Sequence, residues 1–136
     1  QNLHDGLNQA CKFSVKILKK NYKKYEYAYI HLKETDIPGH DNKPIEKKHM
    51  LEYIDATLFK FLRKFAPPNN IKVVVTCDHS TPCKFKAHSA DFVPVLYYDG
   101  LEKVPKAKKF CEKEARTGSF GGMLGNELLK KVGFVK

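Results

Sequence analysis

The apolar run IKVVVTC, at residues 71–77, places the tightest limit on how this chain folds. A continuous run of β-branched and apolar residues is typical of strands inside parallel sheets, where both faces of the sheet are covered. The run ends directly at Asp78 and His79, two side chains of types that bind metal ions. We therefore expect a buried strand that delivers functional residues at its end.

The remaining segments alternate between helical and extended patterns. Apolar residues at helical spacing predict helices over 5–20 and 45–65, while aromatic and β-branched residues predict strands over 25–32 and 93–99. A glycine-rich stretch then leads into a short helix that closes the chain. This order, with long helical crossovers, predicts an α/β fold with a mainly parallel sheet flanked by helices. No repeat or low-complexity linker is visible, so residues 1–136 are expected to form a single unit.

The chain is strongly basic, with 25 Lys and Arg against 15 Asp and Glu and a formal net charge of +10. Such a charge attracts anions without specifying which. The lysines are spread over many segments and no nucleic-acid-binding motif accompanies them, so nucleic acid is not expected as a partner. No apolar run approaches the ~20 residues needed to cross a bilayer. Four cysteines without a CxxC pair suit a reducing compartment, and we expect a cytoplasmic chain without a membrane partner.

Acidic and histidine residues follow two of the predicted strands. Asp36 and His40 come after strand 25–32, and Asp78 and His79 come after strand 71–77, with His88 further along. Ligands in open α/β sheets gather beyond the carboxyl ends of the strands. Carboxylates and imidazoles together suit Zn²⁺, Mn²⁺ or a similar divalent ion. The joint pattern predicts a metal site at this edge.

Each motif has a simpler interpretation when it is taken alone. An Asp-His pair in a loop is more often a turn with a capping aspartate, and a single D-x-x-x-H motif is weak. The remaining histidines, His4, His31 and His49, are expected to be structural, with His49 on an exposed helix face. From spacing alone, a metal site and a set of turn residues both stay open.

Three stretches resemble a known family. TDIPGHD, VVVTCDHSTPCKFKAHSADFVPVLYYDG and EARTGSFGGMLGNELL are similar to the archaeal-type cofactor-independent phosphoglycerate mutases, which belong to the alkaline phosphatase superfamily. The match extends over nearly all of the chain, in the order of the C-terminal portion of such a mutase. The resemblance implies an alkaline-phosphatase-like fold that is incomplete at its N-terminal side.

The resemblance also implies a reaction and a set of ligands. These enzymes interconvert 2- and 3-phosphoglycerate in glycolysis and gluconeogenesis through a phosphoserine, without bisphosphoglycerate and with two divalent ions (Mn, Zn, Co or Mg). By this resemblance Asp36, His40 and His88 hold the first metal, and Asp78 and His79 contribute to the second. The weak candidates for binding the phosphoglycerate substrate are Lys33, Lys84 and Lys86, which are more simply explained as solvated lysines.

The nucleophilic serine of the family has no counterpart in this chain. It belongs to the family's N-terminal part, and Ser14, Ser80, Ser89 and Ser119 do not occupy its place in the pattern. We therefore expect no mutase activity from this chain without the missing N-terminal part. One alternative is a phosphomonoester or phosphodiester hydrolase of the same superfamily. Another is a basic nucleic-acid-binding module with a degenerate metal site.

Overall fold

The computed structural model describes residues 3–100 and 109–135. Contacts divide the chain into two compact units, the first comprising Gln1–Pro68 with Thr81–Ser89 and the second Asn69–Ser80 with Ala90–Lys136. The expectation that residues 1–136 act as a single unit stays a prediction.

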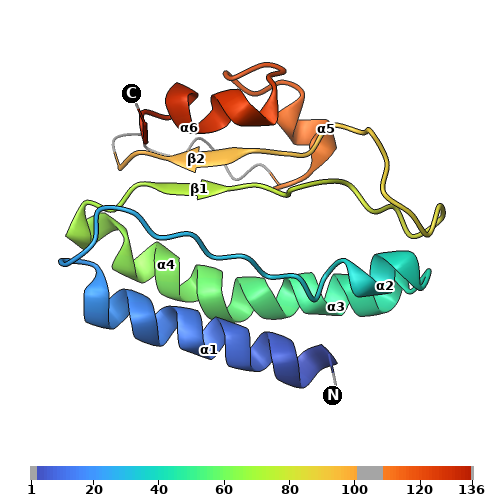
Figure 1. Ribbon diagram of the computed structural model, residues 1–136, viewed down its shortest axis with the longest axis horizontal. Coiled ribbons are helices and arrows are strands. Elements are labelled where there is room, and N and C mark those ends of the chain that lie inside the picture. Colours follow the sequence, from blue (N-terminus) through green and yellow to red (C-terminus); the bar gives the residue numbers. More distant parts are fainter. Residues whose placement is uncertain (1–2, 101–108, 136) are drawn as a thin grey trace. The chain divides into compact units, whose positions relative to one another are not determined.

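Two long helical stretches form the first unit. Helix α1 (Leu3–Asn21) has Asp5 in its first turn and lysines in its last turn, which complement the helix dipole. The second stretch runs from Pro44 to Phe65 as α3 (Pro44–Ile54), the π-helical turn η1 (Asp55–Phe59) and α4 (Lys60–Phe65). Figure 1 shows the two stretches side by side. The helices predicted over 5–20 and 45–65 are therefore confirmed.

The core of the first unit lies between these helices. Leu7 and Cys11 of α1 pack with three residues of the second stretch, namely Met50, Ile54 and Leu58. In each helix these side chains recur every four residues, so they line one face. The phenol of Tyr53 also donates a hydrogen bond to Asn8 Oδ1 at 2.6 Å, which ties α3 to α1.

The second unit contains the sheet. Strand β1 (Val73–Val75) pairs antiparallel with β2 (Leu96–Tyr98), with Val73 opposite Tyr98. The helices α5 (Glu112–Ala115) and α6 (Leu128–Lys131) and the 3₁₀ turn η3 (Gly125–Glu127) follow. The Tyr97 hydroxyl donates to the carbonyl of buried Val132 at 3.3 Å, so the end of the chain packs on β2.

The sheet differs from the one expected. Two of the three predicted strands, 71–77 and 93–99, are present but shorter. Their pairing is antiparallel, so the mainly parallel sheet is not confirmed. The third predicted strand, 25–32, is absent, because these residues form no strand in the described structure. Their alternating pattern nevertheless persists, because Tyr29 is exposed while Ile30 and Leu32 pack against the helical core. An alternating pattern indicates a half-buried segment. It does not supply the neighbouring strand that the backbone needs for hydrogen bonding in a sheet.

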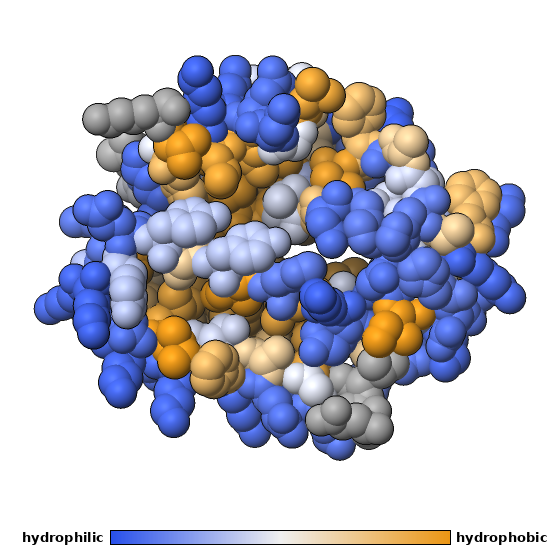
Figure 2. Space-filling model, viewed as in Figure 1, coloured by the Kyte–Doolittle hydropathy of each residue, from blue (hydrophilic) through white to orange (hydrophobic). Residues whose placement is uncertain are grey.

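Large hydrophobic side chains stay exposed in both units. Tyr29 is 72% exposed and Phe92 is 75% exposed. Figure 2 shows orange hydrophobic residues among blue hydrophilic ones on the face in view. In the part of the chain that the structure describes, no helix is both long enough and apolar enough to cross a membrane.

Candidate metal centre

Asp36 and His40 lie at the two ends of the short helix α2 (Ile37–His40). Asp36 is the residue before its first turn and His40 is its last residue, four positions later, so the two side chains lie on the same side. His40 Nε2 is 3.3 Å from Asp36 Oδ2. Between them, Pro38 and Gly39 are buried and anchor the helix.

His88 reaches the same point from the segment Thr81–Ser89. Its Nε2 atom lies 3.2 Å from His40 Nε2 and 3.7 Å from Asp36 Oδ1. One ligand atom from each of the three residues lies within 4.8 Å of the others. The structure thus brings together the three residues that the family resemblance assigned to the first metal, and the metal assignment itself stays a prediction.

The spacing of these atoms fits one divalent ion. A tetrahedral site with bonds of about 2.0–2.1 Å has ligand atoms about 3.3 Å apart. The two distances from His40 Nε2, 3.2 Å to His88 Nε2 and 3.3 Å to Asp36 Oδ2, are close to that value. His88 Nε2 lies 3.7 Å from the other carboxylate oxygen, Oδ1. Two imidazoles and one carboxylate favour Zn²⁺, Mn²⁺ or Co²⁺ over Mg²⁺, which prefers oxygen ligands.

A backbone carbonyl orients His40. Nδ1 of His40 lies 3.1 Å from the carbonyl oxygen of Lys86. Because a carbonyl only accepts hydrogen bonds, this contact places the proton on Nδ1 and leaves the Nε2 lone pair directed toward Asp36 and His88. Lys86 has a φ of 52°, a left-handed conformation that is costly for a residue with a side chain. The chain therefore holds a strained residue at a contact with a ligand.

Thr81 contacts the carboxylate of Asp36. The residue is 5% exposed, and its hydroxyl donates to Asp36 Oδ1 at 2.5 Å. The carbonyl of Thr81 accepts a hydrogen bond of 2.8 Å from Lys47 Nζ on α3. Gly39 is packed closely against the same residue, because a Cβ atom there would lie 2.8 Å from the Thr81 carbonyl oxygen.

The ligand atoms remain open to solvent. The side chains of Asp36, His40 and His88 are 36%, 41% and 52% exposed. An ion here would therefore remain accessible to a small anionic ligand. The candidate substrate-binding lysines are also exposed, namely Lys33, Lys84 and Lys86. Their role in binding substrate stays a prediction.

The chain as a whole matches a known family. A sequence profile of the Metalloenzyme superfamily matches residues 4–134. The chain belongs to the Metalloenzyme superfamily.

Relatives in this superfamily share about a third of the sequence. The 2,3-bisphosphoglycerate-independent phosphoglycerate mutase of Pyrococcus furiosus is 36% identical over 107 residues, which are 79% of this chain and 26% of that protein. A probable enzyme of the same name from Deinococcus radiodurans is 37% identical over 125 residues, 92% of this chain and 30% of that protein. The chain therefore spans less than a third of the length of these relatives. The resemblance to the mutases seen in the sequence is confirmed.

A solved structure is similar as well. The PH0037 protein from Pyrococcus horikoshii is 33% identical, with a TM-score of 0.75. The match covers 90% of this chain and 36% of that one. This Metalloenzyme superfamily chain thus has a solved structural neighbour.

The residues assigned to the second metal lie in the second unit. The backbone N–H of His79 donates to Asp78 Oδ1 at 3.0 Å, and the His79 ring lies 3.5 Å from Asp78 Oδ2. The side chain of Asp78 is 55% exposed and that of His79 is 31% exposed. Their assignment to a second metal stays a prediction.

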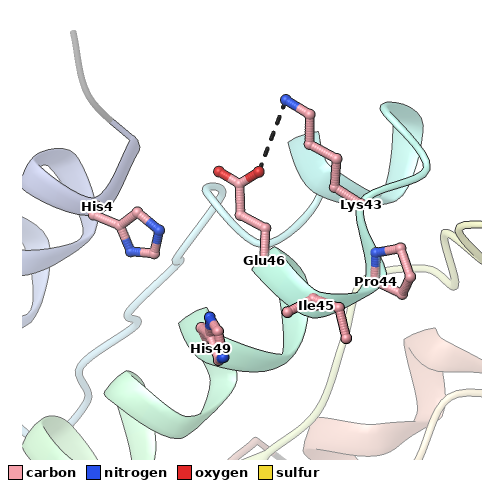
Figure 3. Close-up of a pocket in the computed structure, with 6 residues that line it drawn as sticks. All are labelled: His4, Lys43, Pro44, Ile45, Glu46 and His49. Atoms are coloured by element: carbon pink, nitrogen blue, oxygen red, sulfur yellow. Dashed lines mark ion pairs between the residues drawn. The ribbon is translucent and has the colours of Figure 1, made fainter.

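A surface pocket elsewhere in the first unit contains other histidines. Figure 3 shows His4 of α1 facing Glu46 and His49 of α3 across its opening, and Lys43 pairs with Glu46 at 3.8 Å. None of the predicted ligands lines this pocket. His49 is exposed as expected, which makes it a suitable control position for the metal site.

Sequence reasoning missed two residues that support the candidate centre. Thr81 lies within the quoted motif DHSTPC, but nothing in the motif indicated that its hydroxyl contacts Asp36. Lys47 was not distinguished from the other lysines spread along the chain. The signal that identifies it is spatial, namely a bond across 34 positions of sequence.

Proposed function

We propose that this chain is the metal-binding C-terminal part of a cofactor-independent phosphoglycerate mutase. In this proposal Asp36, His40 and His88 hold one divalent ion. The observation that supports it is the arrangement of two imidazole nitrogens and one carboxylate, from two segments, at separations that suit a single ion. The names and similarity of the relatives support the reaction class.

The role of this chain follows from its side chains. A divalent ion in such a site neutralises phosphate oxygens and helps activate an attacking oxygen. Asp36 and the two imidazoles would bind it, and the Lys86 carbonyl would keep the His40 lone pair directed at it. Asp78 and His79 would contribute to a second ion whose remaining ligands, like the nucleophilic serine, belong to another part of the protein. The mainly parallel sheet and the cytoplasmic location also stay proposals for that whole protein.

The activity test compares this chain with a whole mutase. We expect no interconversion of 2- and 3-phosphoglycerate by residues 1–136 alone, and activity when they are joined to the N-terminal part of a relative such as the Pyrococcus furiosus enzyme. Within that joined protein, His40→Ala should abolish turnover while His49→Ala should not. Turnover by residues 1–136 alone would contradict the proposed division of the active site.

Phosphate release in the same assay tests one alternative function, and a nucleic-acid-binding measurement tests the other. A hydrolase of the superfamily would release inorganic phosphate without forming the other phosphoglycerate. A nucleic-acid-binding module would bind nucleic acid in a salt-dependent manner that is insensitive to EDTA.

A further inference from the structure

We propose that Thr81 makes Asp36 a metal ligand through one oxygen only. This inference rests on the proposed metal site and goes beyond it, because it assigns a positioning role to a residue outside the ligand set. The central observation is the 2.5 Å hydrogen bond from the Thr81 hydroxyl to Asp36 Oδ1. The other carboxylate oxygen, Oδ2, is the one 3.3 Å from His40 Nε2.

The hydrogen bond distinguishes the two carboxylate oxygens. A short bond from a hydroxyl to a carboxylate is strong and directional, and it draws electron density toward the proton. Oδ1 is therefore the poorer donor to a cation, and Oδ2 is left as the ligand atom. An outer partner of this kind fixes the orientation of a ligating carboxylate.

Burial of Thr81 makes this arrangement persistent. The residue is 5% exposed, so its hydroxyl has little water available as a replacement partner. Losing the bond to Asp36 would leave a buried polar group without that acceptor. The hydroxyl is therefore held against Oδ1 rather than exchanging freely with solvent.

Lys47 fixes the backbone that carries this hydroxyl. Its Nζ donates to the Thr81 carbonyl at 2.8 Å, and α3, on which it lies, also carries the core residues Met50 and Ile54. Gly39 packs on the same carbonyl and on the Thr81 methyl group. Thr81 is thus held between α2 and α3, which sets the direction in which its hydroxyl points.

The consequence is a centre with three protein ligand atoms. One carboxylate oxygen and two imidazole nitrogens leave at least one coordination position for a substrate oxygen, as catalytic sites require. If Asp36 bound through both oxygens, the protein would occupy that position itself. Thr81 therefore keeps the ion open to ligand.

Cobalt titration of three proteins tests the proposal, because four-coordinate Co²⁺ absorbs visible light far more strongly than six-coordinate Co²⁺. The proteins are the unmodified chain, Thr81→Ser and Thr81→Val. Valine keeps the shape of threonine without the hydroxyl, whereas serine keeps the hydroxyl. We expect similar intense spectra for the unmodified chain and Thr81→Ser. For Thr81→Val we expect weaker absorption and a loss of about 10-fold or more in Co²⁺ affinity.

The outcomes separate this proposal from the metal site itself. Unchanged absorption for Thr81→Val would overturn the role of Thr81 and leave the metal site standing. No Co²⁺ bound by the unmodified chain would overturn both. Circular dichroism checks folding, and if the valine variant does not fold, Thr81→Ala takes its place with the same expected spectrum.

The variant Lys47→Met tests the role of Lys47. It keeps the Thr81 hydroxyl, so it should weaken Co²⁺ binding without changing the shape of the spectrum. Unchanged Co²⁺ affinity would remove Lys47 from the proposal.

Discussion

Nε2 of His40 and Nε2 of His88 lie 3.2 Å apart, although 48 positions separate the two residues in sequence. His40 comes from the end of α2 and His88 from the segment Thr81–Ser89. Two imidazole nitrogens at this distance, with a carboxylate beside them, form a set in which a divalent ion satisfies all three donors at once.

Removing either imidazole should therefore weaken metal binding. We expect His40→Ala and His88→Ala each to lower the affinity for Zn²⁺, because each change removes a ligand. The loss should exceed the about 10–100-fold that is typical when a residue that only orients a ligand is changed. Competition with a coloured chelator measures this loss. His49→Ala, an exposed histidine on α3 that lines a different pocket, serves as the control and should bind as the unmodified chain does. Equal affinity for all four proteins would place the ion elsewhere.

Gly39 should not tolerate a side chain. A Cβ atom there would lie 2.8 Å from the Thr81 carbonyl oxygen and 2.9 Å from its methyl carbon. We expect Gly39→Ala to lower the free energy of unfolding by about 1–3 kcal/mol, measured by urea denaturation. Gly6→Ala is the matched control, since Gly6 lies in α1 and its nearest neighbour would be 3.6 Å away. That change should raise stability by up to about 1 kcal/mol, because alanine favours helices.

Lys86 should gain stability when it is replaced by glycine. Its φ of 52° costs about 1 kcal/mol for a residue with a Cβ atom, and glycine adopts this conformation readily. Lys86→Gly keeps the carbonyl that contacts His40, so metal affinity should stay the same while the unfolding free energy rises. Lys84→Gly is the control, because Lys84 has no positive φ and should lose stability instead. A loss of stability in Lys86→Gly would contradict the claim of strain.

Burial of Cys11 should make stability depend on pH in alkaline solution. Removal from water raises the pKa of its thiol above the ordinary value of 9.0. At alkaline pH the folded chain then keeps a proton that the unfolded chain releases. The free energy of unfolding therefore has its full value below about pH 9 and falls as the pH rises toward the higher pKa of the folded chain. Urea unfolding at pH 7 and at about pH 10 should show a larger drop for the unmodified chain than for Cys11→Ala. Equal drops would show that Cys11 does not carry this dependence.

The helical part of the fold was predictable because its signals are local. The four-residue spacing of Leu7 and Cys11, and of Met50, Ile54 and Leu58, reflects one buried face per helix. The strands were harder to predict. Apolar runs over 71–77 and 93–99 indicate burial, but the antiparallel pairing of Val73 with Tyr98 depends on which partner the rest of the chain presents.

The candidate site was predictable to the level of its ligand types. Asp36 and His40 share a short D-x-x-x-H segment, and His88 was recognised from the family motif. The bonds from Thr81 to Asp36 and from Lys47 to Thr81 cross 45 and 34 positions of sequence. Contacts of this kind arise from tertiary packing, which the spacing of residues along the chain does not encode.

The most direct test of this account is the metal content of the unmodified chain. After incubation with Zn²⁺ or Mn²⁺ and dialysis, elemental analysis should find about one ion per chain. Such a result agrees with one complete ligand set, formed by Asp36, His40 and His88. A chain that retains no ion under these conditions would contradict the claim that these three residues form a metal centre by themselves.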